Sequence, residues 1–299
     1  MRVLVVGYGS IGSRHCEVLS SLGHEVEVLT SKDLKEFKSY KSFEEIPLSE
    51  FDYFVIATPT NKHFENLEFL NKNVKNKIIF CEKPLFESKK AYLELENSVF
   101  VGYVLRYHPL LLKLKNELKN EKIIYAQAKC SSYLPTWRPN TDYKACYSSD
   151  KERGGGVLLD LSHEIDYISF LSDTSLKLIK AIQAKISNLN ITSDDISMIL
   201  AYCDRALVNI SLNYLSKTPY RQILIETDDN TFELNLITNQ LKISNKFNST
   251  TTINEPNLDR NSLFIAMHAD ALGEQKYICK LSEALNTMRL IDQIQKENI

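Results

Sequence analysis

The stretch that decides the fold is Val3-Leu4-Val5-Val6-Gly7-Tyr8-Gly9-Ser10-Ile11-Gly12, a continuous apolar run followed by the pattern G-x-G-x-x-G. The run predicts a buried strand, and residues 13–22 predict the helix that follows it. In this context the first glycine makes a tight turn, the second lets backbone approach a pyrophosphate, and the third lets the helix pack on the strand. The same loop also occurs as a structural turn and in sites for S-adenosylmethionine or FAD. Its position favours a nicotinamide dinucleotide, whose phosphates would meet the N–H groups at the helix start.

Composition narrows the classes of function. The 299 residues include 36 Lys and Arg against 38 Asp and Glu, which gives a net charge of -2 and no global basic field for a nucleic-acid partner. No apolar run approaches the roughly 20 residues that cross a bilayer, so we expect no membrane span. The six cysteines are scattered without a C-x-x-C pair. They predict free thiols, no metal site and a cytoplasmic location.

The first half of the chain alternates between strand and helix patterns up to about residue 107. Such alternation predicts a doubly wound parallel sheet of the Rossmann type, with helices on both faces. We therefore predict a dinucleotide-binding domain over residues 1–107. The expected strands are 3–6, 24–29, 51–57, 77–81 and 100–105, and the expected helices are 13–22 and 61–71.

The second half of the chain has a different pattern. Stretches that are rich in β-branched residues, or in which apolar and polar residues alternate, follow one another with few helical patterns between them. This pattern predicts an α+β domain with a large, mostly antiparallel sheet over residues 108–299, for substrate binding and oligomerisation. The expected strands are 123–130, 178–186, 196–203, 206–215, 222–226 and 231–237, and the expected helices are 109–119, 157–171, 261–272 and 280–295. A hairpin turn is expected at Asp228-Asp229-Asn230.

The end of the second strand bears on the choice of cofactor. An NAD site usually has an acidic residue there to bond the ribose hydroxyls. This chain has Leu29-Thr30-Ser31-Lys32 instead, with hydroxyls and a cation at that position. We therefore expect a preference for NADP over NAD, with Ser31 and Lys32 holding the 2′-phosphate. Asp33 would restore NAD binding if the loop shifts by one or two residues.

Three further motifs, taken with the glycine loop, resemble the glucose-fructose oxidoreductase / inositol dehydrogenase / MocA family, abbreviated Gfo/Idh/MocA. Thr58-Pro59-Thr60-Asn61-Lys62-His63 is similar to the family's T-P-x-x-x-H loop, and Glu82-Lys83-Pro84 to its E-K-P motif. Gly154-Gly155-Gly156 leads into Asp160 and His163, which resembles its G-G-G-x-x-x-D-x-x-x-H helix. The resemblance implies that Gly7, Tyr8, Gly9, Ser10, Ile11, Gly12, Thr30, Ser31, Lys32, Thr58, Pro59, Thr60, His63, Glu82 and Lys83 hold the cofactor.

The resemblance implies an NAD(P)-dependent dehydrogenase or reductase that acts on a hydroxyl or keto carbon of a sugar derivative. Such a reaction needs a base for the hydroxyl proton, and His163 is the candidate because an unperturbed imidazole titrates at about pH 6.5, close to working pH. Lys83 presents an ammonium that stabilises a developing alkoxide. Asp160 would orient His163 or bind sugar hydroxyls. By resemblance, the Lys83–Pro84 bond is expected to be cis.

One position departs from the family pattern. The family's His usually follows the Asp by four residues, where this chain has Glu164, while His163 follows Asp160 by three. On one continuous helix, Asp160, His163 and Tyr167 would share a face, and one residue rotates a side chain by about 100°. Either the helix is locally rewound, or the geometry of the site differs, or Glu164 takes part of the role. His163 is preferred because Glu164 projects closer to the apolar stripe.

The substrate residues are expected mainly in the Pro-punctuated loop Tyr133-Leu134-Pro135-Thr136-Trp137-Arg138-Pro139. Trp137, the only tryptophan, would stack on a sugar ring, and Arg138 suits a carboxylate or phosphate. Arg106 is a further anion candidate, and Tyr167 a further substrate contact. Of the other histidines, His15 is expected near the cofactor and His268 is expected to be structural. By resemblance to a subgroup associated with bacterial surface-sugar biosynthesis, the leading substrate is a nucleotide-linked or acidic sugar.

Two other functions remain open. One is a glycosidase that oxidises its substrate transiently on tightly bound NAD, and the other is a non-catalytic dinucleotide-binding sensor. The sheet of the second domain would leave an apolar face open in a monomer, so a homodimer or homotetramer is expected.

Overall fold

The computed structural model describes residues 1–88, 95–137 and 141–297 and divides into two compact units. The first unit comprises residues 1–107 and 259–284, and the second comprises residues 108–258 and 285–299. Residues 259–284, which the sequence places in the second predicted domain, thus pack with the first. No helix among the described residues is long and apolar enough to cross a membrane. All six cysteines are free thiols.

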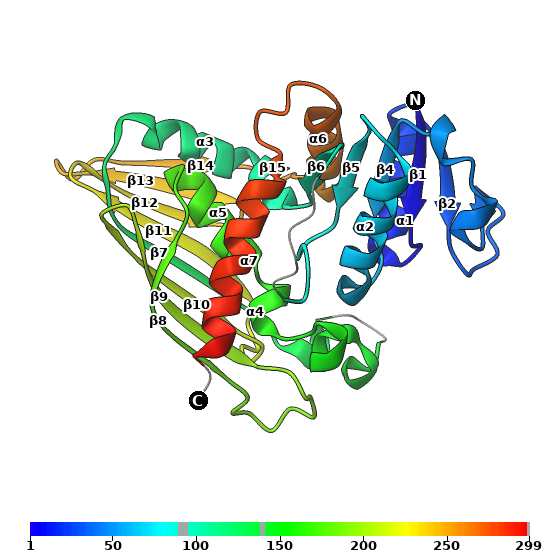
Figure 1. The fold of residues 1–299 in the computed structure, drawn as a ribbon. Coiled ribbons are helices and arrows are strands. Elements are labelled where there is room, and N and C mark those ends of the chain that lie inside the picture. Colours follow the sequence, from blue (N-terminus) through cyan, green and yellow to red (C-terminus); the bar gives the residue numbers. More distant parts are fainter. Residues whose placement is uncertain (89–94, 138–140, 298–299) are drawn as a thin grey trace. The chain divides into compact units, whose positions relative to one another are not determined.

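The first unit is built on a seven-stranded sheet in the order β15-β6-β5-β4-β1-β2-β3 (Figure 1). All its pairs are parallel except β15 with β6. Its strands are β1 (Arg2–Val6), β2 (Glu25–Leu29), β3 (Lys38–Tyr40), β4 (Tyr53–Ile56), β5 (Ile78–Cys81), β6 (Ser98–Val101) and β15 (Cys279–Lys280). Its helices are α1 (Ser10–Ser21), α2 (His63–Asn73) and α6 (Arg260–Leu272). The expected Rossmann sheet is confirmed, and β3 is a strand that the sequence did not predict.

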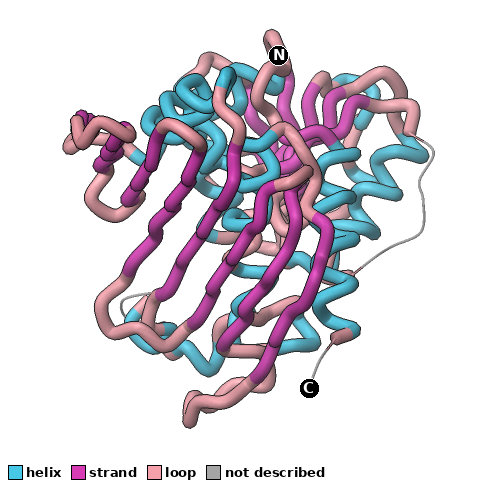
Figure 2. The backbone as a smooth tube through the Cα atoms, turned by 90° about the vertical axis from the view of Figure 1, so that its left-hand side faces the viewer, coloured by secondary structure: helices cyan, strands magenta, loops and turns pink. Residues whose placement is uncertain are grey.

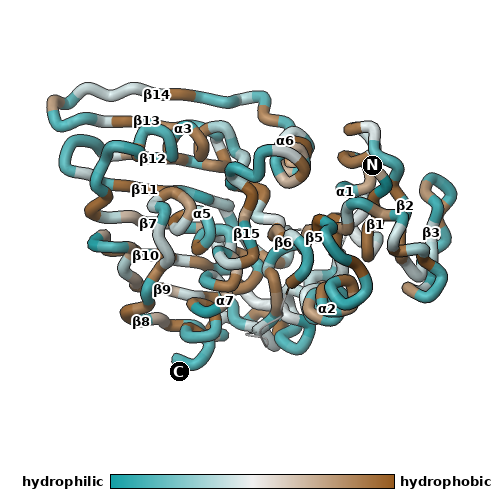
Figure 3. Tube along the Cα trace, turned by 45° about the horizontal axis from the view of Figure 1, so that its top comes forward, coloured by the Kyte–Doolittle hydropathy of each residue, from teal (hydrophilic) through white to brown (hydrophobic). Residues whose placement is uncertain are grey.

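The hydropathy of these strands explains why the sheet lies in the core. Hydrophobic residues, which are brown in Figure 3, are frequent in β1 and β5. Val3, Leu4 and Val5 of β1 have no exposed surface. Strands with a continuous apolar run are typical of parallel sheets that helices cover on both faces. The order of the strands reverses at β1: β2 and β3 lie on one side of it, and β4, β5 and β6 lie on the other. Ligands of such sheets bind beyond the carboxyl ends of the strands at this point.

The second unit is built on an eight-stranded sheet in the order β14-β13-β12-β11-β7-β10-β9-β8, whose long strands run side by side in Figure 2. Only β10 and β7 are parallel. The strands are β7 (Ile123–Ser131), β8 (Lys177–Ala184), β9 (Ile196–Cys203), β10 (Ala206–Asn213), β11 (Tyr220–Thr227), β12 (Asn230–Asn235), β13 (Gln240–Asn245) and β14 (Thr250–Asn254). The mostly antiparallel sheet and the hairpin between β11 and β12 are confirmed, while β13 and β14 were not predicted.

Helices pack against one face of this sheet. They are α3 (Pro109–Glu117) against β12 and β13, α4 (Val157–Asp160) against β9 and β10, and α5 (His163–Ser172) against β7. The helix α7 (Leu281–Lys296) closes the chain.

The prediction of one continuous helix over residues 157–171 is wrong, because the helix breaks between Asp160 and His163. The backbone leaves the helical region at Leu161, with φ -100° and ψ 29°. The single helix on which Asp160, His163 and Tyr167 were expected to share a face is therefore not formed. Local rewinding of the chain is the alternative that the structure adopts.

The start of α4 is capped across the fold by Asp194. Its carboxylate Oδ2 accepts a hydrogen bond of 3.0 Å from the Leu158 N–H, and its backbone carbonyl accepts one of 3.2 Å from Val157. Gly156 has φ +123°, and a Cβ there would lie 2.1 Å from Asp194 Oδ1. The glycine is therefore required by the carboxylate packed against it. Burial raises the pKa of Asp194 to about 6.

This raised pKa predicts a pH-dependent contribution to stability. Because the folded-state pKa lies above the ordinary value of about 3.9, the contribution is fully present below that value and is lost as the pH rises through about 6. Asp194→Asn keeps an acceptor oxygen but cannot ionise. We expect the wild-type free energy of unfolding, minus that of Asp194→Asn, to fall between pH 4 and pH 6. The slope should reach at most about 1.4 kcal/mol per pH unit in urea titrations. A difference that is flat or rises with pH would contradict this assignment.

Candidate active site

The glycine loop lies between β1 and α1 in the first unit. A Cβ on Gly12 would lie 2.1 Å from the Gly7 carbonyl oxygen, so only glycine allows the helix to start this close to the strand. Gly9 has open space on the side where a Cβ would stand. It is also the N-cap of α1, and no side chain caps the first N–H groups of this helix. These donors suit the pyrophosphate of a dinucleotide.

The loop after β2 carries the residues predicted to select the cofactor. Lys32 donates from Nζ to the Tyr8 carbonyl at 2.9 Å and lies 5.9 Å from the Tyr8 ring, so the cation stands beside the glycine loop. The Lys32 N–H donates to Thr30 Oγ1 at 3.2 Å. Asp33, which would restore NAD binding, pairs instead with Lys41 at 2.6 Å.

Lys41 was missed by the sequence reasoning. Its Nζ also donates to the carbonyls of Ser31 and Lys32, at 3.2 and 2.9 Å. It follows β3, the strand that was not predicted, and no local motif indicated that a residue ten positions away would hold this loop.

His63 connects the loops that follow β4 and β5. Its Nε2 lies 2.9 Å from the Thr58 carbonyl oxygen and its Nδ1 lies 3.0 Å from the Pro84 carbonyl oxygen. The imidazole is 1% exposed, and burial lowers its pKa. Both ring nitrogens therefore face the backbone, so His63 ties Thr58-Pro59-Thr60 to the segment containing Lys83. The Lys83–Pro84 bond is cis, as expected from the resemblance.

The second unit holds the other predicted catalytic residues. The Asp160 carboxylate accepts a hydrogen bond from the Tyr214 hydroxyl, a partner that lies 54 residues away and that the sequence did not indicate. His163 begins α5 and is 8% exposed. The Trp137 ring lies 5.6 Å from the Tyr214 ring and is 37% exposed, while Tyr214 has no exposed surface, so Trp137 supplies the exposed aromatic ring beside the buried Tyr214 and Asp160 pair.

Glu164 is fully buried and paired with Arg221. The guanidinium donates from Nε to Oε1 at 2.6 Å and from Nη2 to Oε2 at 3.2 Å. Burial opposes the charge of Arg221, but the Glu164 carboxylate outweighs it and raises the pKa of the guanidinium. The Tyr167 hydroxyl donates to the same carboxylate at 3.3 Å. Glu164 and Tyr167 thus form part of the packed interior of the second unit.

The structure describes one of the two arginines that were predicted to bind an anion. Arg106 is 2% exposed and donates to Glu283 at 3.1 Å and to the Tyr277 carbonyl at 3.3 Å, within the first unit. The binding of a substrate anion by Arg106 stays a prediction, and such an anion would compete with the Glu283 carboxylate for the guanidinium. Arg138 lies outside the described residues.

Comparison with known proteins gives one family and a set of similar folds. Residues 1–99 match the GFO_IDH_MocA model, described as an oxidoreductase family with an NAD-binding Rossmann fold. UDP-N-acetylglucosamine 3-dehydrogenase from Acidithiobacillus ferrooxidans has a similar structure, with a TM-score of 0.80 and 16% identity over 100% of this chain and 97% of that one.

Two further solved structures match at a TM-score of 0.81. An oxidoreductase from Agrobacterium radiobacter, in complex with NAD+, L-tartaric acid and magnesium, is 15% identical and covers 99% of this chain and 96% of that one. A super-repressor mutant of Gal80p from Saccharomyces cerevisiae is 16% identical and covers 99% and 95%. Likeness at this identity concerns the fold, and the predicted fold class is confirmed.

Proposed function

We propose that this chain, a member of the Gfo/Idh/MocA oxidoreductase family, transfers a hydride between a nicotinamide cofactor and a hydroxyl or keto carbon of a sugar derivative. The observation that carries the proposal is the glycine loop with its uncapped α1 start at the reversal point of the sheet, next to the loops of Thr58 and Lys83. A dinucleotide fits this cradle, because Gly9 leaves open space where a Cβ would stand, at the uncapped start of α1.

The cofactor supplies the hydride chemistry, and this chain supplies binding and proton transfer. The α1 start would hold the pyrophosphate, and Thr30, Ser31 and Lys32 would hold the adenosine ribose. His63 keeps the Thr58 and Pro84 loops together, which fixes the backbone directly after Lys83.

Lys83 and His163 are the proposed acid–base groups. When an alcohol is oxidised, the hydride leaves carbon and the hydroxyl proton passes to a base, for which the neutral His163 imidazole is suited. The Lys83 ammonium stabilises the negative charge that develops on the oxygen. Tyr214 fixes one oxygen of Asp160, which keeps this carboxylate in place for the substrate side of the site.

We propose a nucleotide-linked or acidic sugar as substrate, used in bacterial surface-sugar biosynthesis. The Trp137 ring, which is 37% exposed and packs against the buried Tyr214 ring, gives a surface on which a sugar ring can stack. A protein of the same fold is a UDP-N-acetylglucosamine dehydrogenase, which supports this class at the level of the fold. A cytoplasmic location remains a prediction.

The two alternative functions predict different behaviour. A glycosidase that oxidises transiently would keep its cofactor through purification and show no net reduction of it. A non-catalytic sensor, which the likeness to Gal80p favours, would bind the dinucleotide and turn over no sugar.

A panel of sugars and nucleotide sugars, assayed for cofactor reduction at 340 nm, tests the proposed reaction. We expect turnover with at least one nucleotide sugar. His163→Ala should lower kcat by about 10² to 10⁴, because a general base contributes that much, and Lys83→Met should lower it comparably. His24→Ala and Lys72→Met, which lie outside the site, serve as matched controls. A His163→Ala kcat close to wild type would remove this residue from the mechanism.

Cofactor preference is tested by titrating NADP+ and NAD+ into the protein. We expect tighter binding of NADP+, and about tenfold weaker NADP+ binding in Lys32→Ala with little change for NAD+. Lys41→Ala should also reduce the preference, since it releases the Asp33 carboxylate that Lys41 now neutralises. Lys35→Ala, an exposed cation nearby, is the control. Equal affinity for the two cofactors, or a preference for NAD+, would contradict the assignment.

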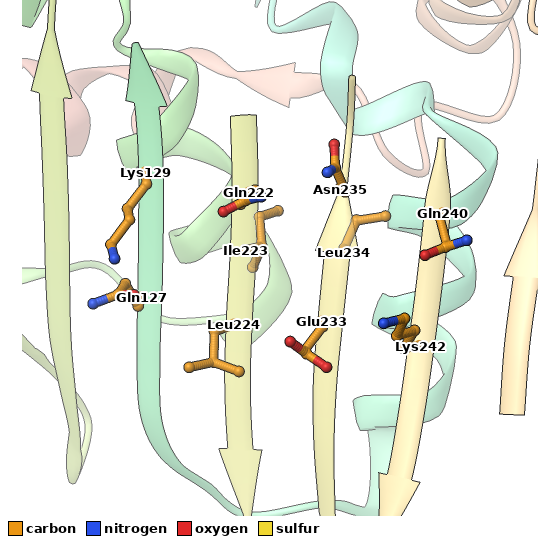
Figure 4. A pocket seen from close by; sticks show the side chains of 10 residues that line it. All are labelled: Gln127, Lys129, Gln222, Ile223, Leu224, Glu233, Leu234, Asn235, Gln240 and Lys242. Atoms are coloured by element: carbon orange, nitrogen blue, oxygen red, sulfur yellow. The ribbon is translucent and has the colours of Figure 1, made fainter. Parts of the chain in front are cut away.

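We also propose self-association through the sheet face opposite α3, α4 and α5. Side chains that share this face by register are unusually exposed for their size, namely Ile182, Met198, Leu200, Tyr202 and Leu207 at 37–49%. Further along the face is a shallow pocket of about 260 Å³, where Lys129, Glu233 and Lys242 stand among amide side chains (Figure 4). An apolar area beside polar groups is typical of an interface between subunits.

Light scattering after size exclusion tests this association. We expect a dimer or tetramer for the wild type and a monomer for Leu200→Lys, because a lysine there would be desolvated at the interface. Ile237→Lys replaces an exposed apolar residue in the turn after β12 and should leave the assembly unchanged. A wild-type monomer at micromolar concentration, or a Leu200→Lys protein of wild-type size, would refute the interface.

A further inference from the structure

A chain of four polar side chains runs through the interior of the first unit. The Tyr53 hydroxyl lies 2.8 Å from His268 Nδ1, His268 Nε2 lies 2.8 Å from His15 Nδ1, and His15 Nε2 lies 2.9 Å from Glu82 Oε1. Tyr53, His268 and His15 have no exposed surface, and the Glu82 side chain is 12% exposed. The four come from β4, α6, α1 and the residue after β5.

When both imidazoles are neutral, the hydrogen bonds of this chain can run in only one direction. An ionised carboxylate only accepts, so His15 donates to Glu82 from Nε2–H. If His15 is neutral, its Nδ1 accepts, and His268 must donate from Nε2–H. His268 Nδ1 then accepts from the Tyr53 hydroxyl. Every donor and acceptor is satisfied with both imidazoles neutral, and burial, with His15 nearby, lowers the pKa of His268 well below its usual value.

The last member of the chain reaches the backbone of the proposed catalytic lysine. Glu82 Oε2 accepts a hydrogen bond of 3.1 Å from the Lys83 N–H, while Oε1 receives the bond from His15. Each carboxylate oxygen therefore has a separate task. One is anchored in the interior and the other holds the peptide from which the Lys83 side chain projects.

Aromatic rings enclose the histidine pair. Phe80 and Phe264 lie 5.4 and 5.5 Å from the His15 ring, both edge-on. His268 also lies 5.1 Å from Phe80. Such an apolar lining strengthens each hydrogen bond and makes an unmade one costly, so the orientation of Glu82 is determined by the chain behind it.

We propose that His15 and His268 are positioning residues that hold Glu82, and through it the backbone of Lys83, in the arrangement that the reaction requires. The proposal rests on the proposed function, because it assumes that Lys83 acts on the substrate. His268 was expected to be only structural, and His15 only to line the start of a helix near the cofactor.

The first test is the tautomer of each histidine, which does not depend on activity. Imidazole ¹⁵N shifts in the full-length protein should show both His15 and His268 as neutral Nε2–H tautomers. In Glu82→Leu, which removes the acceptor, the His15 signals should shift. A Nδ1–H tautomer or an imidazolium at either residue in the wild type would overturn the proposal.

The second test separates positioning from folding and uses whichever sugar of the panel turns over. His15→Leu and His268→Leu should lower kcat by about tenfold to a hundredfold, the size of effect that misplacing a reacting group produces, with the KM for the cofactor within about twofold. His15→Gln, which places an amide donor near the Nε2 position, should recover most of kcat. Cys16→Ala creates a cavity beside His15 on α1 and controls for loss of packing, with thermal melts recorded for every variant.

The outcomes distinguish this proposal from the proposed function. If Lys83→Met has the wild-type rate, the role of Lys83 fails and the positioning proposal fails with it. If Lys83→Met is inactive while His15→Leu keeps the wild-type kcat, the positioning proposal alone is overturned. Loss of kcat in Cys16→Ala equal to that in His15→Leu, without recovery in His15→Gln, would also overturn it.

Discussion

The close approach of α1 to β1 is the constraint on which the first unit depends. Gly12 stands so near the Gly7 carbonyl that a methyl group in its place would lie 2.1 Å from that oxygen. This contact brings the start of α1 to the carboxyl edge of the sheet, where the loops after β2, β4 and β5 also begin. The same helix carries His15, so one packing contact sets both the anion-binding end of α1 and the buried chain that leads to Glu82.

Much of this architecture follows from local sequence. The apolar run of β1, the glycines and the period of α1 sufficed to predict a Rossmann sheet, because strand, turn and helix signals coincide there. Prediction from the sequence failed where the local pattern is weak or misleading. The apolar stripe over residues 157–171 predicts one helix, yet the backbone turns at Leu161. The strand β14 consists mostly of Thr, and β13 is short; β13 forms on the edge of β12, and β14 forms on the edge of β13.

The partners of the site residues could not be predicted, since they depend on tertiary contact. Arg221 meets Glu164 across 57 residues, and His268 meets His15 across 253. No periodicity or motif links such pairs in a single sequence. Residues 259–284 pack with the first unit, which places His268 beside α1 although it was assigned to the other half of the chain. The motifs thus identified which residues carry the chemistry, and the fold determines how their neighbours hold them.

Transfer of deuterium from the substrate to the cofactor is the most direct measurement of the proposed hydride transfer. A nucleotide sugar deuterated at its ring carbons is incubated with the protein and NADP+, and the reduced cofactor is examined by NMR. We expect deuterium at one face of the nicotinamide C4, and loss of this transfer in Lys83→Met. Binding of the cofactor without deuterium in the ring, across the panel of sugars, would contradict hydride transfer and leave a dinucleotide-binding protein without redox chemistry.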